Sequence, residues 1–236
     1  MPIKLNPRLE RCAGYVARGG TALDIGTDHA YLACFLIESG LSRRVIASDI
    51  ADGPLSAARQ TVVRQGLSER IAVLKSDGLK DIPDEVLCEA TDVIIAGMGG
   101  ELIAEILSHG EKLPRSVNLI LQPNSRAAVL RGFLYGEGFK IISESAVRDG
   151  RFTYTVINAE YRGEARELTE LERTVGRLDP RDPVSREYLE NEITRLRSAA
   201  KGMAAASSQE QHQSAVQLLS LAAQIEEYIA KALSKG

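Results

Sequence analysis

The stretch L-D-I-G-T-D-H-A-Y, residues 23–31, decides how this chain folds. It completes a short apolar run that predicts a strand over residues 21–25, and it opens a segment with helical spacing over residues 31–39. A strand that ends in Asp-x-Gly and leads into a helix is typical of a doubly wound α/β fold, where the polar part of a cofactor binds at this turn. Gly26 lets the backbone approach a ligand, and Asp24 offers a carboxylate to an amino group.

Strands and helices are expected to alternate around this stretch. Strands are predicted over residues 21–25, 44–48, 71–75, 91–96, 117–121, 140–146 and 153–159, and helices over residues 31–39, 54–65, 101–109 and 126–136. The runs D-V-I-I-A-G and V-N-L-I-L-Q-P are apolar throughout, as in a parallel sheet that is covered on both faces. Residues 147–151 predict a hairpin turn, so the seventh strand is antiparallel. These elements predict an α/β fold with a seven-stranded, Rossmann-like sheet.

Helix-forming residues dominate after Tyr161. Apolar residues recur at heptad spacing in two segments, namely Leu189, Ile193, Leu196, Ala200 and Met203, and then Ala215, Leu218, Ala222, Ile225, Ile229 and Ala232. With Ala206-Ser207-Ser208 as link and N-cap, they predict an antiparallel helical hairpin. We therefore expect a catalytic domain over residues 1–162 and a helical, coiled-coil-like domain over residues 163–236. The hairpin either extends a binding surface or only packs on the first domain or on another subunit.

Composition excludes several classes of protein. Hydrophobic residues make up 44% of the 236 residues, yet no apolar run approaches the ~20 residues of a membrane helix. The N-terminus lacks the apolar core of a signal peptide, so we expect a cytoplasmic protein. Cys12, Cys34 and Cys88 are far apart, outside any CxxC and in apolar-patterned segments, which predicts buried thiols, no disulfide framework and no metal site. The net charge of −3 means that any RNA contact must come from a local basic patch.

The loop after the first strand is acidic. In a phosphate-binding G-x-G-x-x-G loop that begins at Gly26, the second glycine would stand at the position of Asp28. A carboxylate at that place repels a pyrophosphate, which disfavours NAD and FAD. The zwitterionic methionine group of S-adenosylmethionine suits the loop better, so we expect that cofactor.

Further polar sites follow the next three strands in order. Asp49, 25 residues after Asp24, can bind both ribose hydroxyls, and Asp77 can accept the adenine amino hydrogens. A single strand-end Asp often only caps a helix, but an ordered set favours a cofactor site. The residues predicted to bind the cofactor are Asp24, Ile25, Gly26, Asp49, Ile50, Ser76, Asp77, Gly78, Ala96, Gly97, Met98, Gly99 and Gly100.

The chain resembles the bacterial tRNA (adenine-N1)-methyltransferases that act on adenine 22, the TrmK family. The segments D-I-G-T-D-H-A-Y-L (24–32), S-D-G-L (76–79), I-A-G-M-G-G-E-L-I (95–103) and L-I-L-Q-P-N (119–124) carry the resemblance. It covers the whole chain, and the combination of D-H-A-Y with G-M-G-G and Q-P-N is specific. Ala33 stands where the family commonly has proline, and Asp49 where it often has glutamate; neither change affects the expected cofactor site.

The resemblance implies methyl transfer from S-adenosylmethionine to N1 of an adenine in tRNA, without a metal. Its catalytic candidates are Asp28, His29, Tyr31, Gln122, Pro123 and Asn124. Asp28 would stabilise the cationic product ring, His29 and Tyr31 would orient the base, and the Q-P-N segment would accept its amino hydrogens. A flipped base could reach such a pocket. Structural alternatives are a helix cap for His29, a core position for Tyr31, and a strand exit for Q-P-N.

Basic residues, mostly arginines, could grip RNA phosphates in two regions of the chain. Arg126, Arg131, Arg148 and Arg151 are expected near the rim of the site; others populate the connector and the first C-terminal helix, namely Arg166, Arg173, Arg177, Arg181, Arg186, Arg195, Arg197 and Lys201. Interspersed glutamates make solvated ion pairs the alternative for most of them. A monomer is favoured. Two other functions stay open: a methyltransferase of a small molecule or protein that dimerises through the hairpin, and a non-catalytic binding module.

Overall fold

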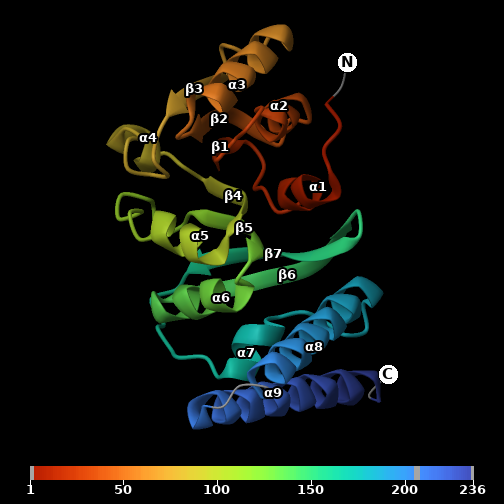
Figure 1. Cartoon of the computed structure of the whole chain (residues 1–236). Helices are drawn as coiled ribbons and strands as arrows, with labels where there is room; N and C mark the ends of the chain where they lie inside the picture. Colours follow the sequence, from red (N-terminus) through yellow and green to blue (C-terminus); the bar gives the residue numbers. More distant parts are fainter. Residues whose placement is uncertain (1–2, 205–207, 235–236) are drawn as a thin grey trace.

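The computed structural model describes residues 3–204 and 208–234, and a single mixed sheet runs through its centre (Figure 1). Its strands are β1 (Gly20–Ile25), β2 (Ser42–Asp49), β3 (Ile71–Lys75), β4 (Asp92–Gly99), β5 (Asn118–Ser125), β6 (Phe139–Asp149) and β7 (Phe152–Tyr161). They lie in the order β3-β2-β1-β4-β5-β7-β6. Neighbours among β1 to β5 pair in parallel, whereas β7 is antiparallel to both β5 and β6. The predicted Rossmann-like sheet, with its antiparallel seventh strand, is confirmed.

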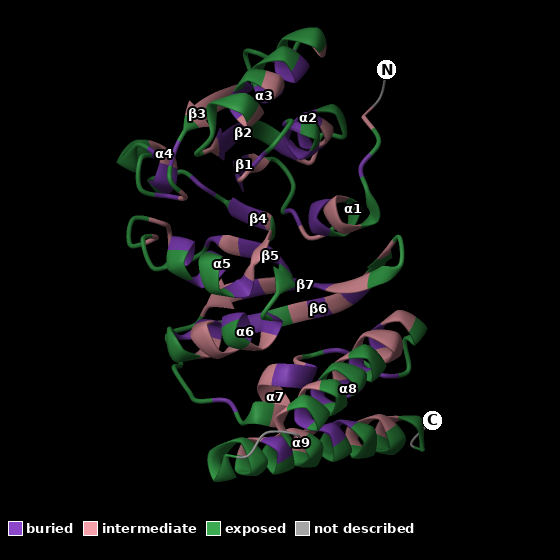
Figure 2. Ribbon diagram, viewed as in Figure 1, coloured by how far each residue is buried: buried purple, intermediate pink, exposed green. Residues whose placement is uncertain are grey.

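Helices cover both faces of the sheet, as the continuously apolar strands require. One face carries α1 (Pro7–Ala13), α2 (Tyr31–Glu38) and α3 (Asp52–Arg64); the other carries α4 (Asp84–Cys88), α5 (Gly100–Leu107) and α6 (Ala127–Gly136). The central strands β1, β4 and β5 are largely buried (Figure 2). Because β1 to β5 run in parallel, they all end at one edge of the sheet, where loops lead into the helices.

Local signals explain where these helices begin. Asn6 caps α1, since its side chain accepts a hydrogen bond from the Leu9 amide at 2.9 Å and Pro7 occupies the first turn. Helix α3 starts at Asp52, two residues before the predicted Pro54. Helix α4 was not predicted, because five residues are too few to display helical periodicity. Cys12 and Cys34 are buried as expected, but Cys88 is exposed at the end of α4, so the prediction for that thiol is wrong.

The C-terminal part forms the predicted hairpin and one further helix. Helices α8 (Pro183–Ala204) and α9 (Gln209–Leu233) pack along each other through the heptad positions (Figure 1). Of the expected link, Ala206 and Ser207 lie outside the described residues; Ser208 holds the N-cap position of α9 without a side-chain cap bond. The extra helix, α7 (Glu170–Val175), begins with a capping box formed by Thr169 and Glu172.

A buried ion pair joins this part to the sheet. Arg131 of α6 contacts Glu144 of β6 at 2.7 Å and donates to the carbonyls of Arg173 and Thr174 in α7. Thr155 of β7 donates to the same carboxylate. Arg131 is thus buried and paired inside the protein, so it is not available to bind an RNA phosphate. Hairpin residues also pack against Ala146 of β6.

Candidate active site

The predicted residues meet at the carboxyl-terminal edge of the parallel strands. Strand order reverses between β1 and β4, and doubly wound sheets bind ligands outside such a switch point. A cavity of about 460 Å³ lies there. Nine predicted site residues line it, namely Asp24, Gly26, Asp28, His29, Tyr31, Ala96, Gly97, Gln122 and Asn124. The volume suits a small ligand together with a single base.

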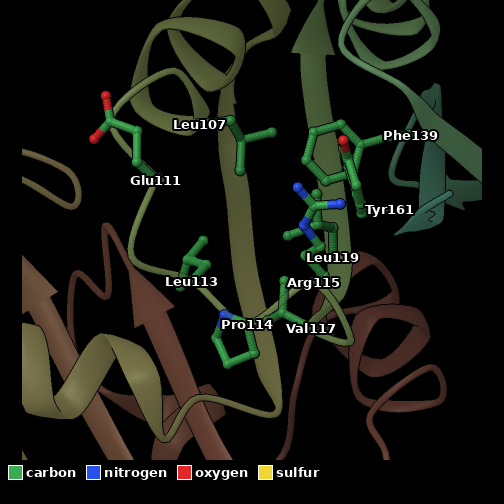
Figure 3. Close-up of a pocket in the computed structure, with 10 residues that line it drawn as sticks. Leu107, Glu111, Leu113, Pro114, Arg115, Val117, Leu119, Phe139 and Tyr161 are labelled. Carbon is green, nitrogen blue, oxygen red and sulfur yellow. The ribbon is translucent and has the colours of Figure 1, made fainter. Parts of the chain in front are cut away.

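A second cavity, of about 190 Å³, lies at the opposite end of the strands, between the start of β5 and the end of β7 (Figure 3). Leu119, Phe139 and Tyr161 form its apolar side, and the guanidinium of Arg115 lies 5.0 Å from the centre of the Tyr161 ring. None of the predicted site residues lines this cavity. It is therefore separate from the candidate active site.

Asp24 is a buried carboxylate in the wall of the larger cavity. The Thr27 hydroxyl donates to it at 2.6 Å. Burial raises the pKa of Asp24 to about 6; the Thr27 hydrogen bond opposes this shift and the charge of Asp49 adds to it. No lysine or arginine among the described residues forms an ion pair with this carboxylate. Its surroundings suit a ligand that brings a positive charge.

The loop between β1 and α2 is strained. Asp28 and Ala30 have positive φ angles of 47° and 56°, which non-glycine residues seldom adopt. Strained backbone of this kind clusters at functional sites. His29 stacks on Tyr31 with ring centres 5.4 Å apart, and its Nε2 lies 3.5 Å from an Asp28 oxygen. Tyr31 is 44% exposed, and Ala30 rather than His29 holds the N-cap of α2, so neither structural alternative describes these side chains.

Asp49 and Asp77 lie at the ends of neighbouring strands, outside the lining of the cavity. The Asp49 carboxylate accepts the Ala51 amide at 2.9 Å, and Ile50 beside it is 61% exposed. Asp77 pairs with Lys80 at 2.6 Å. Eight further predicted residues also lie outside the lining of this cavity, namely Ile25, Ile50, Ser76, Gly78, Met98, Gly99, Gly100 and Pro123.

Amide side chains join the ends of β4 and β5. Gln122 accepts the Gly97 amide at 3.1 Å, and Asn124 donates to the Gly97 carbonyl at 2.7 Å. The Asn124 oxygen also accepts from Gln122 Nε2 at 3.3 Å. Because these bonds extend the pairing of the two strands, β5 runs through Ser125 rather than ending at residue 121.

Arg8 of α1 is the main residue that the sequence did not identify. Its Nη1 donates to Asn124 at 2.8 Å and approaches Gln122 at 3.4 Å, while its Nε pairs with Asp149 at 2.7 Å. The guanidinium also lies over the Tyr154 ring, 4.7 Å from its centre. Asn6, Leu9 and Thr27 line the same cavity and were also missed. Nothing in the sequence near Arg8 indicated partners more than a hundred residues away.

Two glycines are required by close packing in this edge. Gly26 has a φ of 78°, and a Cβ there would overlap the end of the Met98 side chain. A Cβ at Gly100 would overlap the carbonyl oxygen of Arg126. Glycine is therefore required at both positions by packing within the protein, against a side chain at Gly26 and against backbone at Gly100.

Comparison with known proteins decides the family. The sequence profile described as tRNA (adenine(22)-N(1))-methyltransferase, TrmK, matches residues 22–228. The chain belongs to this family. Its members transfer a methyl group from S-adenosylmethionine to N1 of adenine 22 in tRNA, so the enzyme class and the cofactor expected from the sequence are confirmed.

Individual members of the TrmK family support this assignment. The tRNA (adenine(22)-N(1))-methyltransferase of Bacillus subtilis strain 168 is 41% identical over 159 residues, which are 67% of this chain and 66% of that relative. The crystal structure of the B. subtilis m1A22 tRNA methyltransferase TrmK has a TM-score of 0.84 at 32% identity, covering 94% of this chain and 99% of the other. Streptococcus pneumoniae Sp1610 in complex with S-adenosyl-L-methionine has a TM-score of 0.80 at 32% identity, covering 92% and 97%.

Two absences concern the described residues alone. Within residues 3–204 and 208–234, no cluster of His, Cys, Asp and Glu could hold a metal ion. No helix in the same part of the chain is long and apolar enough to cross a membrane.

Proposed function

We propose that this chain methylates N1 of adenine 22 in tRNA at the cavity between β1, β4 and β5. The observation that carries the proposal is the convergence of two kinds of group on one cavity. Asp24 suits a cationic amine, whereas Asp28 and Asn124 suit the polar edge of a base. Family membership supplies the reaction, and this geometry supports the assignment of its residues.

Cofactor binding is assigned to the ordered acidic residues. Asp24 would bind the methionine amine, because its buried carboxylate pairs with no lysine or arginine in the part of the chain that the structure describes. Asp49 would bind the ribose hydroxyls, and Asp77 the adenine amino group. The residues that would shape the remaining surface are Ile25, Gly26, Ile50, Ser76, Gly78, Ala96, Gly97, Met98, Gly99 and Gly100. Bound there, S-adenosylmethionine supplies a methyl group that leaves the sulfonium as the bond to N1 forms.

The remaining residues would hold the target base. Adenine N1 carries an in-plane lone pair, so positioning contributes more than a strong general base. Asp28 would stabilise the cationic ring and accept the exocyclic proton. His29 and Tyr31 form a stacked pair against which the base can rest. Pro123 and the amides of Gln122 and Asn124 would recognise its edge.

Arg8 supports this assignment of the two amides. Its Nη1 reaches both Gln122 Oε1 and Asn124 Oδ1, as a donor on the adenine amino group would. When adenine binds, its amino hydrogens would therefore replace the Arg8 Nη1 donor at these two amide oxygens. Arg8 would keep its ion pair with Asp149 and its contact with Tyr154.

The C-terminal helical domain, residues 163–236, is assigned to tRNA binding, and residues 1–162 to catalysis. Every proposed cofactor residue precedes residue 163, and tRNA is larger than the catalytic face. A chain ending at Tyr161 should keep its affinity for S-adenosylmethionine and lose most of its tRNA affinity, with a shallower salt dependence. A soluble fragment with unchanged tRNA affinity and salt slope would remove the helices from the RNA surface. A monomer in the cytoplasm remains part of the proposal.

Incubation with unmodified tRNA and labelled S-adenosylmethionine, followed by mapping of the methylated base, tests the reaction. We expect one methylated nucleotide, N1-methyladenine at position 22. Asp28→Ala and Asn124→Ala should lower the rate and leave cofactor affinity nearly unchanged, while Asp84→Ala, an exposed acid on α4, should change neither. Methylation elsewhere would contradict the substrate assignment, and equal loss of cofactor affinity would contradict the assignment of these two side chains to the base.

A further inference from the structure

A groove of about 630 Å³ adjoins the catalytic cavity. It lies between the end of β5, the start of α6, the start of β7 and the helices α7 and α8. Asn124 lines both the groove and the catalytic cavity, so the two spaces meet at a proposed base-binding residue. Its volume is ample for a nucleotide.

One side of the groove suits a nucleobase. Tyr154 borders it, and the guanidinium of Arg8 covers the Tyr154 ring at 4.7 Å, which holds that ring in place. Ala128 and Val129 of α6 add apolar surface, and Val129 is 40% exposed. Unpaired RNA bases stack on aromatic side chains with little regard to sequence.

Arg126 lines the groove close in sequence to the residue that both spaces share. It follows Asn124 by two residues and has a positive φ of 57°, a strained conformation for an arginine. Gly100 makes room for its carbonyl oxygen, because a Cβ at that glycine would overlap it. The Arg126 side chain is 67% exposed and its Nε lies 3.9 Å from a Glu101 oxygen, which leaves the guanidinium available to an anion.

Acidic residues that line the groove lie on the helical side, away from Arg126. Glu192 of α8 is paired with Arg195 at 2.7 Å, and Glu170 belongs to the first turn of α7. The charge distribution therefore favours an anionic group at the β5 end of the groove and a neutral ring beside Tyr154.

We propose that this groove binds the base of the nucleotide next to the target adenine, and that Arg126 binds the phosphate that joins the two nucleotides. An adenine extruded into the catalytic cavity carries its neighbour with it, one phosphodiester away. The groove that shares Asn124 is within that reach. This inference rests on the proposed function, because it deepens the description of the same RNA substrate.

The test is a cycle of enzyme and substrate changes. Full-length enzyme is assayed for kcat/KM on unmodified tRNA and on two tRNAs that lack the base on the 5′ or on the 3′ side of adenine 22. Tyr154→Leu should lower kcat/KM on intact tRNA about tenfold, the scale of losing one base-stacking contact. On one of the two abasic tRNAs it should cause no further loss. A role of Tyr154 in merely supporting Arg8 would give the same loss on all three substrates.

Arg126→Gln tests the phosphate contact. It should lower kcat/KM about tenfold and reduce the salt slope of tRNA binding by about one. Arg44→Gln is the matched control, because Arg44 also lies 3.9 Å from a glutamate, Glu89, but on β2 away from the groove. Calorimetry should show unchanged affinity for S-adenosylmethionine in all three variants.

The outcomes separate the two proposals. If the wild-type enzyme does not methylate adenine 22, the proposed function fails and this inference falls with it. If it does, but the Tyr154 loss is the same on both abasic tRNAs or Arg126→Gln behaves like Arg44→Gln, only the inference is overturned.

Discussion

Asp24 and Glu144 are both buried carboxylates, but the protein surrounds them differently. Glu144 has Arg131 at 2.7 Å, the Thr155 hydroxyl and the Arg177 amide as partners, so both of its carboxylate oxygens accept hydrogen bonds. Asp24 has one hydroxyl and no cation among the described residues. A buried charge without a partner costs stability, whereas an opposite charge and hydrogen bonds offset much of that cost. The comparison indicates that the protein completes the Glu144 site itself and leaves the Asp24 site for a ligand to complete.

The pKa values follow the same division. Burial lowers the pKa of Arg131, but the charge of Glu144 and the hydrogen bonds outweigh it and the net shift is upward. For Asp24, burial raises the pKa to about 6 and the Thr27 bond only partly opposes it. The folded protein therefore stabilises the charged form of Arg131 and destabilises the charged form of Asp24.

The largest expected effect is at the completed site. Arg131→Met should lower the free energy of unfolding by about 3–5 kcal/mol, because it leaves Glu144 buried without a cation. Urea denaturation measures this, and the double variant Arg131→Met/Glu144→Leu should recover part of the loss. A loss below about 1 kcal/mol would mean that the ion pair is not desolvated, and this would contradict the description of Glu144 as a buried charge.

Asp24→Asn should raise, rather than lower, the free energy of unfolding at neutral pH. Since the folded-state pKa is about 6 and the ordinary value is 3.8, the unfolded chain ionises first as pH rises. The cost of the buried charge thus accumulates between pH 4 and 6 and is constant above, at about 3 kcal/mol for two pKa units. We expect the variant to gain stability above pH 6, to match the wild type near pH 4, and to lose cofactor binding. Thermal unfolding across this pH range would contradict the account if the variant were less stable at pH 7.

Asp49→Ala should give a smaller effect on binding alone. It should weaken the binding of S-adenosylmethionine by ~1–3 kcal/mol, the scale of hydrogen bonds to a charged acceptor. Asp52→Ala is the control, because that exposed carboxylate pairs with Lys75 at the start of α3. Calorimetry that found equal affinities for the Asp49 variant and the wild type would refute the ribose assignment.

The comparison also separates what the sequence could and could not predict. Asp24, Asp49 and Asp77 each follow an apolar strand, so a local pattern identifies them. Arg131 lies among apolar residues of a helix, and its partners are up to 43 residues away, so no local pattern places it inside. Arg8 was missed for the same reason, because its hydrogen-bond partners lie 114 to 141 residues away. Local signals predicted the strands and the cofactor edge, whereas tertiary ion pairs needed the fold.

The central claim is that Asp24 is left without a cation so that the methionine amine can supply one. Titration calorimetry of S-adenosylmethionine at pH 6, in two buffers of different ionisation enthalpy, measures the protons exchanged on binding. At that pH Asp24 is about half protonated, and an incoming ammonium favours its ionised form, so about half a proton should be released. At pH 7 the release should nearly vanish, and 5′-methylthioadenosine, which lacks the amine, should release none at either pH. No proton release at pH 6, or the same release with 5′-methylthioadenosine, would contradict the account.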